Sequence, residues 1–369
     1  MELTPIQKQR LYNIDALRII CMLFVCLLHV GGTYGGISAV EGVAGKSLLA
    51  FVIILSDVAV NCFIMITAYV AGGREWKVSR YLKLYAQVAF YCVGFSVVGW
   101  LISSYTTGGG AVTFQTFLLW NLPVPFASAY WYFVDYSALF LLAPFIDKLL
   151  RILNRKQFVL LLAVTVGVIV IQGIIPPYQD KVSGYSVYWM VCMYLLGYYL
   201  RCYPLHLTRC GGWLGVIGCG CAGTALFGLA VYGKKHGYEI PNFAIGYTQP
   251  FVVIESILLF SLFAQFNVRG ARARGWISRL APLSFGVYLV HEHPAFSPYV
   301  KEACMTLYSW IGCNCATVLM ASVITYILAS MVDFARLALF HRLRVEQGAV
   351  ALGNKVERGI KSIFCRYFP

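Results

Sequence analysis

The chain has 369 residues, of which 60% are hydrophobic and only 12% carry a charge, and its mean hydropathy is +0.72. A soluble domain carries roughly 25% charged residues, and it could not cover this much apolar surface with polar groups. The composition therefore excludes an ordinary soluble protein and predicts an integral membrane protein with spans of ~20 apolar residues.

The net charge of +14 raises the hypothesis of nucleic-acid binding. The basic residues lie in short loops between apolar runs, however, which is typical of topology signals rather than of a nucleic-acid-binding face. The 13 cysteines contain no CxxC pair, and most of them lie inside apolar runs. Buried Cys behaves as a small hydrophobe. We therefore expect neither a nucleic-acid partner nor a bound metal.

The apolar runs predict an all-α integral membrane protein, a polytopic bundle of about ten transmembrane helices. The predicted spans are, approximately, residues 14–34, 48–71, 81–103, 129–148, 157–175, 185–201, 212–232, 248–267, 281–300 and 314–338. Segment 113–121 is apolar but short, so we expect it to be re-entrant or to lie on a surface. The ninth run contains Pro294 and Pro298, which predict a kink or a broken helix.

The loop charges predict the orientation of this bundle. With ten spans and both termini in the cytoplasm, all but five of the 29 Lys and Arg residues fall on the inside, as the positive-inside rule requires. We expect residues 1–340 to form the bundle. We expect residues 341–369 to form a basic cytoplasmic tail that lies on the anionic leaflet.

The first span carries two ionisable side chains on one helical face. Arg18 and His29 are eleven residues apart, close to three turns, so they share a face at a separation of roughly 16 Å along the axis. Asp15 precedes Arg18 by three residues and can pair with it. Ionisable groups within a span are costly and often functional. The alternatives are that Arg18 marks the end of the span and that His29 makes a structural polar contact.

The next two spans carry polar residues at helical spacing. Asp57 and Asn61 are four residues apart in the second span and could face the same cavity. Arg80 and Lys83 lie one turn apart at the start of the third span and are expected to point the same way. Topology marking would explain these two cations, and binding of an anionic ligand's phosphates is the alternative.

Two later spans add single candidates. Trp131 opens the fourth span from the outside, where an aromatic belt is the ordinary explanation. Glu255 stands in the eighth span, where it could act as an acid or base or could partner a neighbouring cation. We include both residues among the candidate substrate contacts.

The ninth span carries a second intramembrane histidine. Ser284, Tyr288 and His291 follow i, i+4, i+7 spacing and therefore line one face of a helix. His291 lies ten residues into the run, so it reaches a depth similar to that of His29. Two histidines at one depth predict a shared polar site, and a structural hydrogen bond between helices is the alternative.

These patterns together resemble the membrane acyltransferase-3 family. The hallmark of that family is an arginine, ten residues and a histidine, which Arg18 and His29 match. Residues 131–133 followed by 142–145, and residues 284–294, are similar to two later family segments in the right order. The resemblance covers about residues 13–295.

Two departures from the family pattern stand in the second and third spans. Thr67 and Ala68 occupy the place where Ser-Gly is common. Arg80 and Lys83 occupy the place where many members carry two arginines, which makes phosphate binding there less certain.

The resemblance implies an O-acyltransferase of the bacterial cytoplasmic (inner) membrane. Acetyl-CoA would be the donor on the cytoplasmic side, and a cell-envelope or exopolysaccharide sugar, free or lipid-linked, would be the acceptor. His29 would act as a base or as an acyl relay, and both roles are left open. Arg18 would bind the CoA phosphates or stabilise developing charge as a catalytic residue, and Arg80 and Lys83 would add to the phosphate site. His291 with Tyr288 would orient the acceptor or donate to the oxyanion.

A multispan transporter or flippase for a glycan-related or small anionic substrate is the competing function. Broken helices and intramembrane charges also mark transport sites. Related sequence halves would favour a transporter, and we find none in this sequence.

Overall fold

The computed structural model describes residues 10–72, 75–106, 130–174, 184–237 and 246–367, without the side chains of 103–106 and 361–367. These residues form helices and no strand, which confirms the predicted all-α class. The short apolar segment 113–121 lies outside the described residues.

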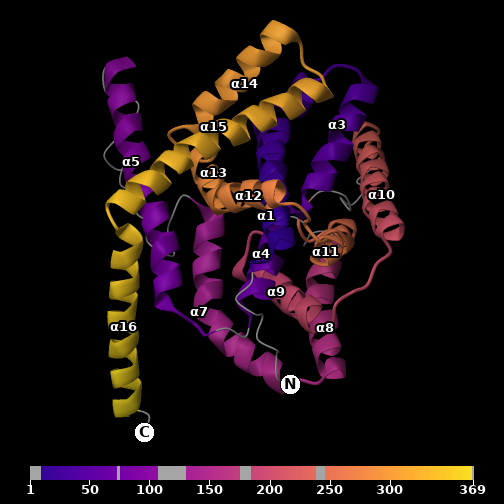
Figure 1. Ribbon diagram of the computed structural model, residues 1–369. Helices are drawn as coiled ribbons and strands as arrows, with labels where there is room; N and C mark the ends of the chain where they lie inside the picture. Colours follow the sequence, from indigo (N-terminus) through magenta and orange to yellow (C-terminus); the bar gives the residue numbers. More distant parts are fainter. Residues whose placement is uncertain (1–9, 73–74, 107–129, 175–183, 238–245, 368–369) are drawn as a thin grey trace.

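The helices of the described residues are shown in Figure 1. Their bounds are α1 Tyr12–Leu28, η1 His29–Thr33, α2 Gly36–Ala39, α3 Val43–Ser56, α4 Val58–Ala71, α5 Val78–Thr106, α7 Trp131–Ile152, α8 Arg155–Ile174, α9 Val187–Cys202, α10 Arg209–Lys235, α11 Pro250–Gln265, α12 Ala271–Leu280, η2 Ala281–Leu283, α13 Ser284–His291, α14 Ser297–Ile311, α15 Cys315–Arg342 and α16 Val345–Tyr367.

Within the described residues, six helical segments are long and apolar enough to cross a membrane. They are Tyr12–Thr33, Val43–Ala71, Val78–Ile102, Arg155–Ile174, Arg209–Lys235 and Cys315–Arg342. The apolar helix α11 is shorter, with 16 residues. The chain is therefore a multi-pass membrane protein. The count of about ten spans and the cytoplasmic position of both termini stay predictions.

Two predicted spans are broken helices in the structure. The second span consists of α3 and α4, which meet at Asp57. Just before this break, the Ser56 hydroxyl donates to the Val52 carbonyl, a back-bond that often bends helices. The ninth span divides into α13 and α14 on either side of Pro294, as the prolines predicted.

Helix α1 forms the centre of the bundle and contacts α3, α4, α11, α13 and α15. Its Leu17, Cys21 and Cys26 are completely buried. At its start, the Asn13 side-chain amide donates to the Phe263 and Ala264 carbonyls in the last turn of α11. Because helix ends leave their carbonyls without intrahelical partners, this contact caps α11 and fixes the position of α1.

The backbones of α4 and α9 approach each other so closely that there is no room for a side chain at residue 197. A Cβ added to Gly197 of α9 would lie 2.6 Å from the Met65 Cα of α4. Glycine therefore permits the two backbones to meet here, as small residues do between membrane helices.

The predicted tail is a helix that packs against the bundle. Helix α16 begins after Arg344, whose positive φ of 54° ends α15 and turns the chain. Helix α16 packs beside α5 in Figure 1. The Glu357 carboxylate accepts a hydrogen bond from the Val78 N–H at the start of α5, at 2.7 Å. The domain boundary at residue 340 and the contact of the tail with the leaflet stay predictions.

Replacing Gly197 with alanine should destabilise the protein by about 1–3 kcal/mol, because the added methyl group forces α4 and α9 apart. Thermal unfolding in detergent would measure the change. Gly218→Ala on α10 is the matched control, since nothing lies within 4 Å of its added Cβ. Equal stability of both variants would contradict the close α4–α9 contact.

Candidate functional site

A cavity of about 380 Å³ in the bundle contains several of the predicted site residues. Its walls include Arg18, His29, Trp131 and Tyr288. We call this space the central cavity. It brings together residues from the first, fourth and ninth predicted spans, and it confirms that Arg18 and His29 face the same side of α1.

A local change of helix type positions His29. Helix α1 passes into the five-residue π turn η1 at His29, in a segment that contains Gly31 and Gly32. The Tyr34 N–H donates to the His29 carbonyl at 2.6 Å, an i+5 bond that places the Tyr34 ring beside the His29 ring. Single π turns inside helices often occur at functional sites.

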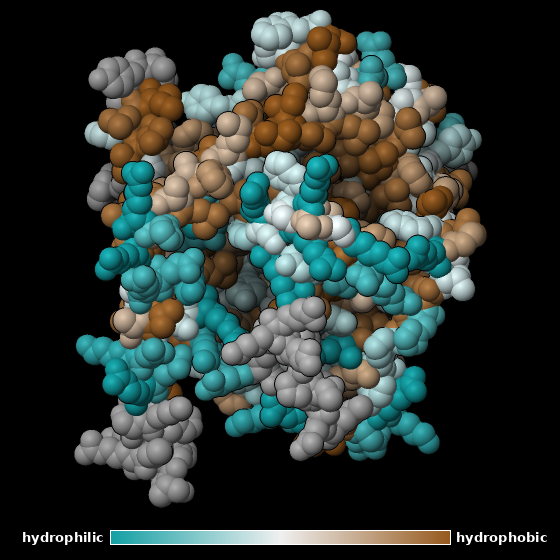
Figure 2. Space-filling view, viewed as in Figure 1, coloured by the Kyte–Doolittle hydropathy of each residue, from teal (hydrophilic) through white to brown (hydrophobic). Residues whose placement is uncertain are grey.

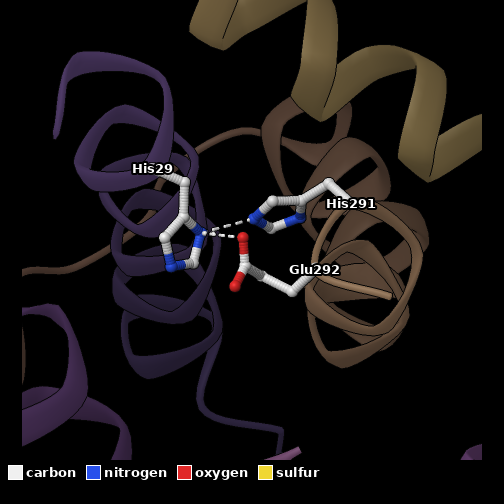
Figure 3. Close-up of side chains that lie close together, drawn as sticks. All are labelled: His29, His291 and Glu292. Carbon is white, nitrogen blue, oxygen red and sulfur yellow. Dashed lines mark hydrogen bonds and ion pairs between the residues drawn. The ribbon is translucent and has the colours of Figure 1, made fainter. Parts of the chain in front are cut away.

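His29 and His291 form a direct hydrogen bond across two helices (Figure 3). The Nδ1 of His29 lies 2.8 Å from the Nε2 of His291. The Nδ1 of His291 lies 2.6 Å from the Val287 carbonyl. Because a carbonyl only accepts, His291 must carry its proton on Nδ1, and in the neutral ring its Nε2 is then the acceptor.

This hydrogen-bond chain assigns the tautomer of His29. Since His291 accepts at Nε2, His29 donates from Nδ1, and its own Nε2 keeps a lone pair. Figure 3 shows this second ring nitrogen of His29 pointing away from His291 and Glu292. His29 can therefore act as a general base through Nε2, while a hydrogen bond from Nδ1 to His291 holds its ring.

Glu292 adds a carboxylate to the pair. Its Oε1 lies 3.3 Å from the Nδ1 of His29 and accepts a hydrogen bond from the Tyr34 hydroxyl at 2.6 Å. A proton gained at Nε2 would make His29 an imidazolium, and this carboxylate would stand beside the new charge. Base, orienting group and carboxylate follow the logic of a catalytic triad.

The same three side chains are the natural candidates for a metal site in the described chain. One ligand atom from each of His29, His291 and Glu292 lies within 4.8 Å of the others. Two imidazole nitrogens on one tetrahedral Zn²⁺ would stand about 3.3 Å apart. The observed 2.8 Å is the length of a hydrogen bond, so this geometry fits a shared proton better than a shared cation.

Arg18 lies in the second turn of α1, and its side chain lines the central cavity. Its guanidinium Nη1 lies 2.8 Å from the Asp15 carboxylate, as the three-residue spacing predicted. Asp15 also binds Arg10 at 2.7 Å. One acid between two arginines leaves net positive charge around Arg18, and the remaining Arg18 donors can meet an anion.

A buried ion pair anchors the helix that carries His291. Asp333 of α15 is completely buried and binds Arg336 through two hydrogen bonds, at 2.7 and 2.9 Å. It also accepts from the Tyr91 hydroxyl. The carboxylate lies so close to Gly286 of α13 that any added Cβ would collide with it. The early turn of α13 is thereby fixed against α15.

Aromatic side chains form part of the wall of the central cavity. Trp131 packs against Tyr185 with ring centroids 4.4 Å apart, and Tyr247 stacks on Trp131 at 6.2 Å. All three residues line the cavity, together with Tyr132 and Tyr288. Trp131 therefore contributes to a cavity wall.

A second cavity of about 290 Å³ adjoins the central one. Thr67 and Tyr136 line both spaces. Its wall also carries four cations, so we call it the basic cavity; they are Lys77, Arg80, Lys148 and Arg151.

Several predicted site residues lie away from both cavities. The Lys83 ammonium binds Glu346 of α16 at 3.1 Å, whereas Arg80 lines the basic cavity. The expectation that these two cations point the same way is therefore wrong: the C-terminal helix, which spacing within one segment cannot reveal, supplies Lys83 with a separate partner.

Asp57, Asn61 and Glu255 also fall outside the walls of the two cavities. Asn61 bonds the Tyr247 carbonyl at 2.9 Å and the Trp189 indole N–H at 2.9 Å, and it is completely buried. Asp57 accepts from the Gly246 N–H at 3.2 Å. Asn61 and Asp57 hold the bundle together, and Asn61 does so directly behind the aromatic wall.

Comparison with known proteins identifies the family. The sequence model for an acyltransferase domain, that of the acyltransferase-3 family, matches residues 11–332. The chain belongs to this family. No curated protein and no solved structure gave a match. The match runs from α1 into α15, so both cavities and the histidine pair of this acyltransferase lie inside the matched region.

The spacing arguments did not assign roles to two residues of the site. Tyr34 is five residues from His29, outside the i+3 and i+4 positions that share a face in an α-helix, and only the π turn brings it back. Glu292 follows His291 directly, and the end of α13 at His291 lets both side chains reach His29. The pair Gly31-Gly32 was the available signal for the wide turn.

Glu292→Gln should lower the rate of acyl transfer by about 10²–10⁴-fold, because the amide keeps the shape of the side chain but removes the charge beside His29. Initial rates with the purified acyltransferase would measure this. Glu302→Gln, an exposed change on α14, is the control. Full activity of Glu292→Gln would show that the carboxylate is not needed.

Proposed function

We propose that this acyltransferase moves an acyl group, most simply acetyl, from acyl-CoA to a hydroxyl of a cell-envelope or exopolysaccharide sugar. The observation that carries the proposal is the position of His29, in the wall of one cavity that is also lined by the Arg18 guanidinium and by several aromatic rings. We place the protein in the bacterial cytoplasmic membrane, with Arg18 toward the cytoplasm in agreement with the loop charges.

The donor would enter from the basic side. CoA is long and carries several phosphates, and the planar guanidinium groups of Arg18 and Arg80 suit phosphate. The basic cavity and the central cavity meet at Thr67 and Tyr136. A donor bound with its phosphates in the basic cavity could extend its pantetheine arm past Thr67 toward His29.

The acceptor would bind against the aromatic side chains of the cavity wall. Trp131, Tyr185 and Tyr247 offer ring faces and hydroxyl groups around one part of the cavity. Such amphipathic rings can pack against the apolar face of a sugar while their polar groups accept or donate hydrogen bonds. The reactive hydroxyl of the acceptor would approach the Nε2 of His29. The acceptor would be a free or a lipid-linked glycan.

As a base, His29 would take the hydroxyl proton at Nε2 while the acceptor oxygen attacks the thioester carbonyl. The C–S bond then breaks, and the CoA thiolate leaves with the proton returned from His29. Glu292 stabilises the imidazolium between these events, and His291 holds the ring. In the alternative relay, the Nε2 of His29 attacks the thioester carbonyl, and the C–S bond breaks as the CoA thiolate leaves. The acceptor oxygen then attacks the acyl group on Nε2, the N–C bond breaks to restore His29, and the hydroxyl proton balances the one that CoA takes up as a thiol.

His29→Ala should reduce acyl transfer by about 10²–10⁴-fold while the protein stays in the membrane fraction. Release of CoA and ester formation in proteoliposomes with acetyl-CoA and a candidate glycan would be measured together. Arg18→Ala should raise the KM for acetyl-CoA, with Arg209→Ala on exposed α10 as its control. Normal transfer by folded His29→Ala would overturn the proposal, and glycan movement without CoA release would favour a transporter.

A single-turnover experiment separates the two roles of His29. Labelled acetyl-CoA mixed with the enzyme in the absence of acceptor should leave label on the protein if His29 is a relay. No label should remain if His29 is a base, although the same preparation transfers acetyl once the acceptor is added.

Thr67→Phe should raise the KM for acyl-CoA at least about tenfold, because a large ring would narrow the junction of the two cavities. Donor titration of the purified enzyme would measure this. Thr224→Phe on α10 is the matched control: its hydroxyl makes the same i−4 back-bond as that of Thr67, away from both cavities. An unchanged KM in Thr67→Phe would rule out this route for the donor.

A further inference from the structure

Helix α12 is unlike the other helices of the bundle because no residue in its ten-residue length is buried. It lies crosswise to α1 in Figure 1. Its two ends lead to α11 and to η2, so it remains tied to the protein while most of its surface faces outward. A helix that lies across the others is oriented to rest on a membrane surface rather than to cross it.

The side chains of α12 separate into two faces. Ile277 and Leu280 are half-buried and turn toward the bundle. Arg272, Trp276 and Arg279 follow i, i+4, i+7 spacing and are all exposed, so they form one outward strip. We call these three residues the basic strip. Trp276 is 62% exposed, and the Arg279 guanidinium lies 5.7 Å from its ring centroid.

The strip has a surplus of positive charge that the described protein does not neutralise. No Asp or Glu occurs between Gln265 and His291. Arg274, which points elsewhere, donates to the Val268 carbonyl and stacks over Tyr12. In contrast, Arg272 makes no hydrogen bond or ion pair with the described residues. Hydrophilic side chains gather over and below α12 in Figure 2, with hydrophobic side chains above it over α14 and α15.

We propose that the basic strip of α12 binds the phosphate headgroups of anionic lipids in the cytoplasmic leaflet. Exposed arginines supply the positive charge, and an exposed tryptophan is the residue type that settles at the headgroup level of a bilayer. A basic amphipathic helix with these features lies in the interface plane. The partner is therefore a lipid surface, and its recognition is electrostatic with an aromatic anchor.

This contact is connected to the central cavity. Leu280 leads directly into η2, whose Ala281 and Pro282 line the cavity that also contains Arg18. The Arg10 guanidinium, which binds Asp15 beside Arg18, also donates to the Ser278 carbonyl of α12 at 3.3 Å. Lipid bound to α12 holds the rim of the cavity in place, so acyl transfer depends on the anionic lipid content of the membrane.

The test measures lipid binding at Trp276 directly. The full chain is placed in bilayers that contain brominated phosphatidylglycerol or brominated phosphatidylcholine, because bromine quenches a tryptophan that it touches. The chain has eight tryptophans. Subtracting the quenching measured in the Trp276→Phe variant from that of the unaltered protein leaves the quenching of Trp276 alone. Varying the fraction of each brominated lipid gives a binding constant of the Trp276 site for that lipid. The ratio of the constant for phosphatidylglycerol to that for phosphatidylcholine is the preference for the anionic lipid.

We expect a preference for the anionic lipid that falls about fivefold for each of Arg272→Gln and Arg279→Gln, since one arginine near such a surface contributes about 1 kcal/mol. Lys301→Gln, an exposed charge change on α14, should leave it unchanged. Acyl transfer by the unaltered enzyme should rise with the phosphatidylglycerol fraction, and this dependence should weaken in Arg272→Gln.

Three results would overturn the proposal. Trp276 could be unquenched by either brominated lipid, which would place α12 away from the bilayer. Equal quenching by both lipids would remove the anionic preference. Finally, an unchanged lipid preference in the arginine variants, with a raised KM for acyl-CoA in every bilayer, would assign the strip to the donor instead.

Discussion

The hydrogen bond between His29 and His291 is the interaction on which the rest of the site depends. It joins the central helix α1 to the broken ninth span, and the Val287 carbonyl behind His291 fixes its direction. Without that carbonyl either ring could donate, and the free nitrogen of His29 would carry a proton in half of the arrangements. A single backbone oxygen thus decides which atom faces the cavity as a base.

The bundle around this bond is arranged to keep it in register. The early turn of α13 is fixed by the Asp333–Arg336 pair, and the last turn of α11 is held to α1 by Asn13. Breaking a buried pair of this kind leaves an uncompensated charge, so its loss is more costly than that of an exposed pair. The polar residues deep in the bundle divide into those that face the cavities and those that secure the helices around them.

The sequence predicted those parts of the site that obey helical spacing. Arg18, His29 and Tyr288 line one cavity because α1 and α13 are regular up to those residues. Spacing failed where the helix changed type, as at Tyr34, and where a distant segment supplied a partner, as Glu346 does for Lys83. It also grouped Asp57 and Asn61 with the site, since a polar residue in a span looks the same whether it faces a cavity or a neighbouring helix.

The π turn at His29–Thr33 contains one residue more than an α-helical turn would use at that place. Such a turn is equivalent to a single-residue insertion that the helix has absorbed without losing direction. Removing Gly31 or Gly32 would return the segment to α-helical register and place Tyr34 four residues after His29, on the same face of the helix. Arg18 and His29 would keep their shared face, and Tyr34 would stay on the side of Glu292. The wide turn therefore lengthens the chain by one residue without separating Tyr34 from the base and the carboxylate.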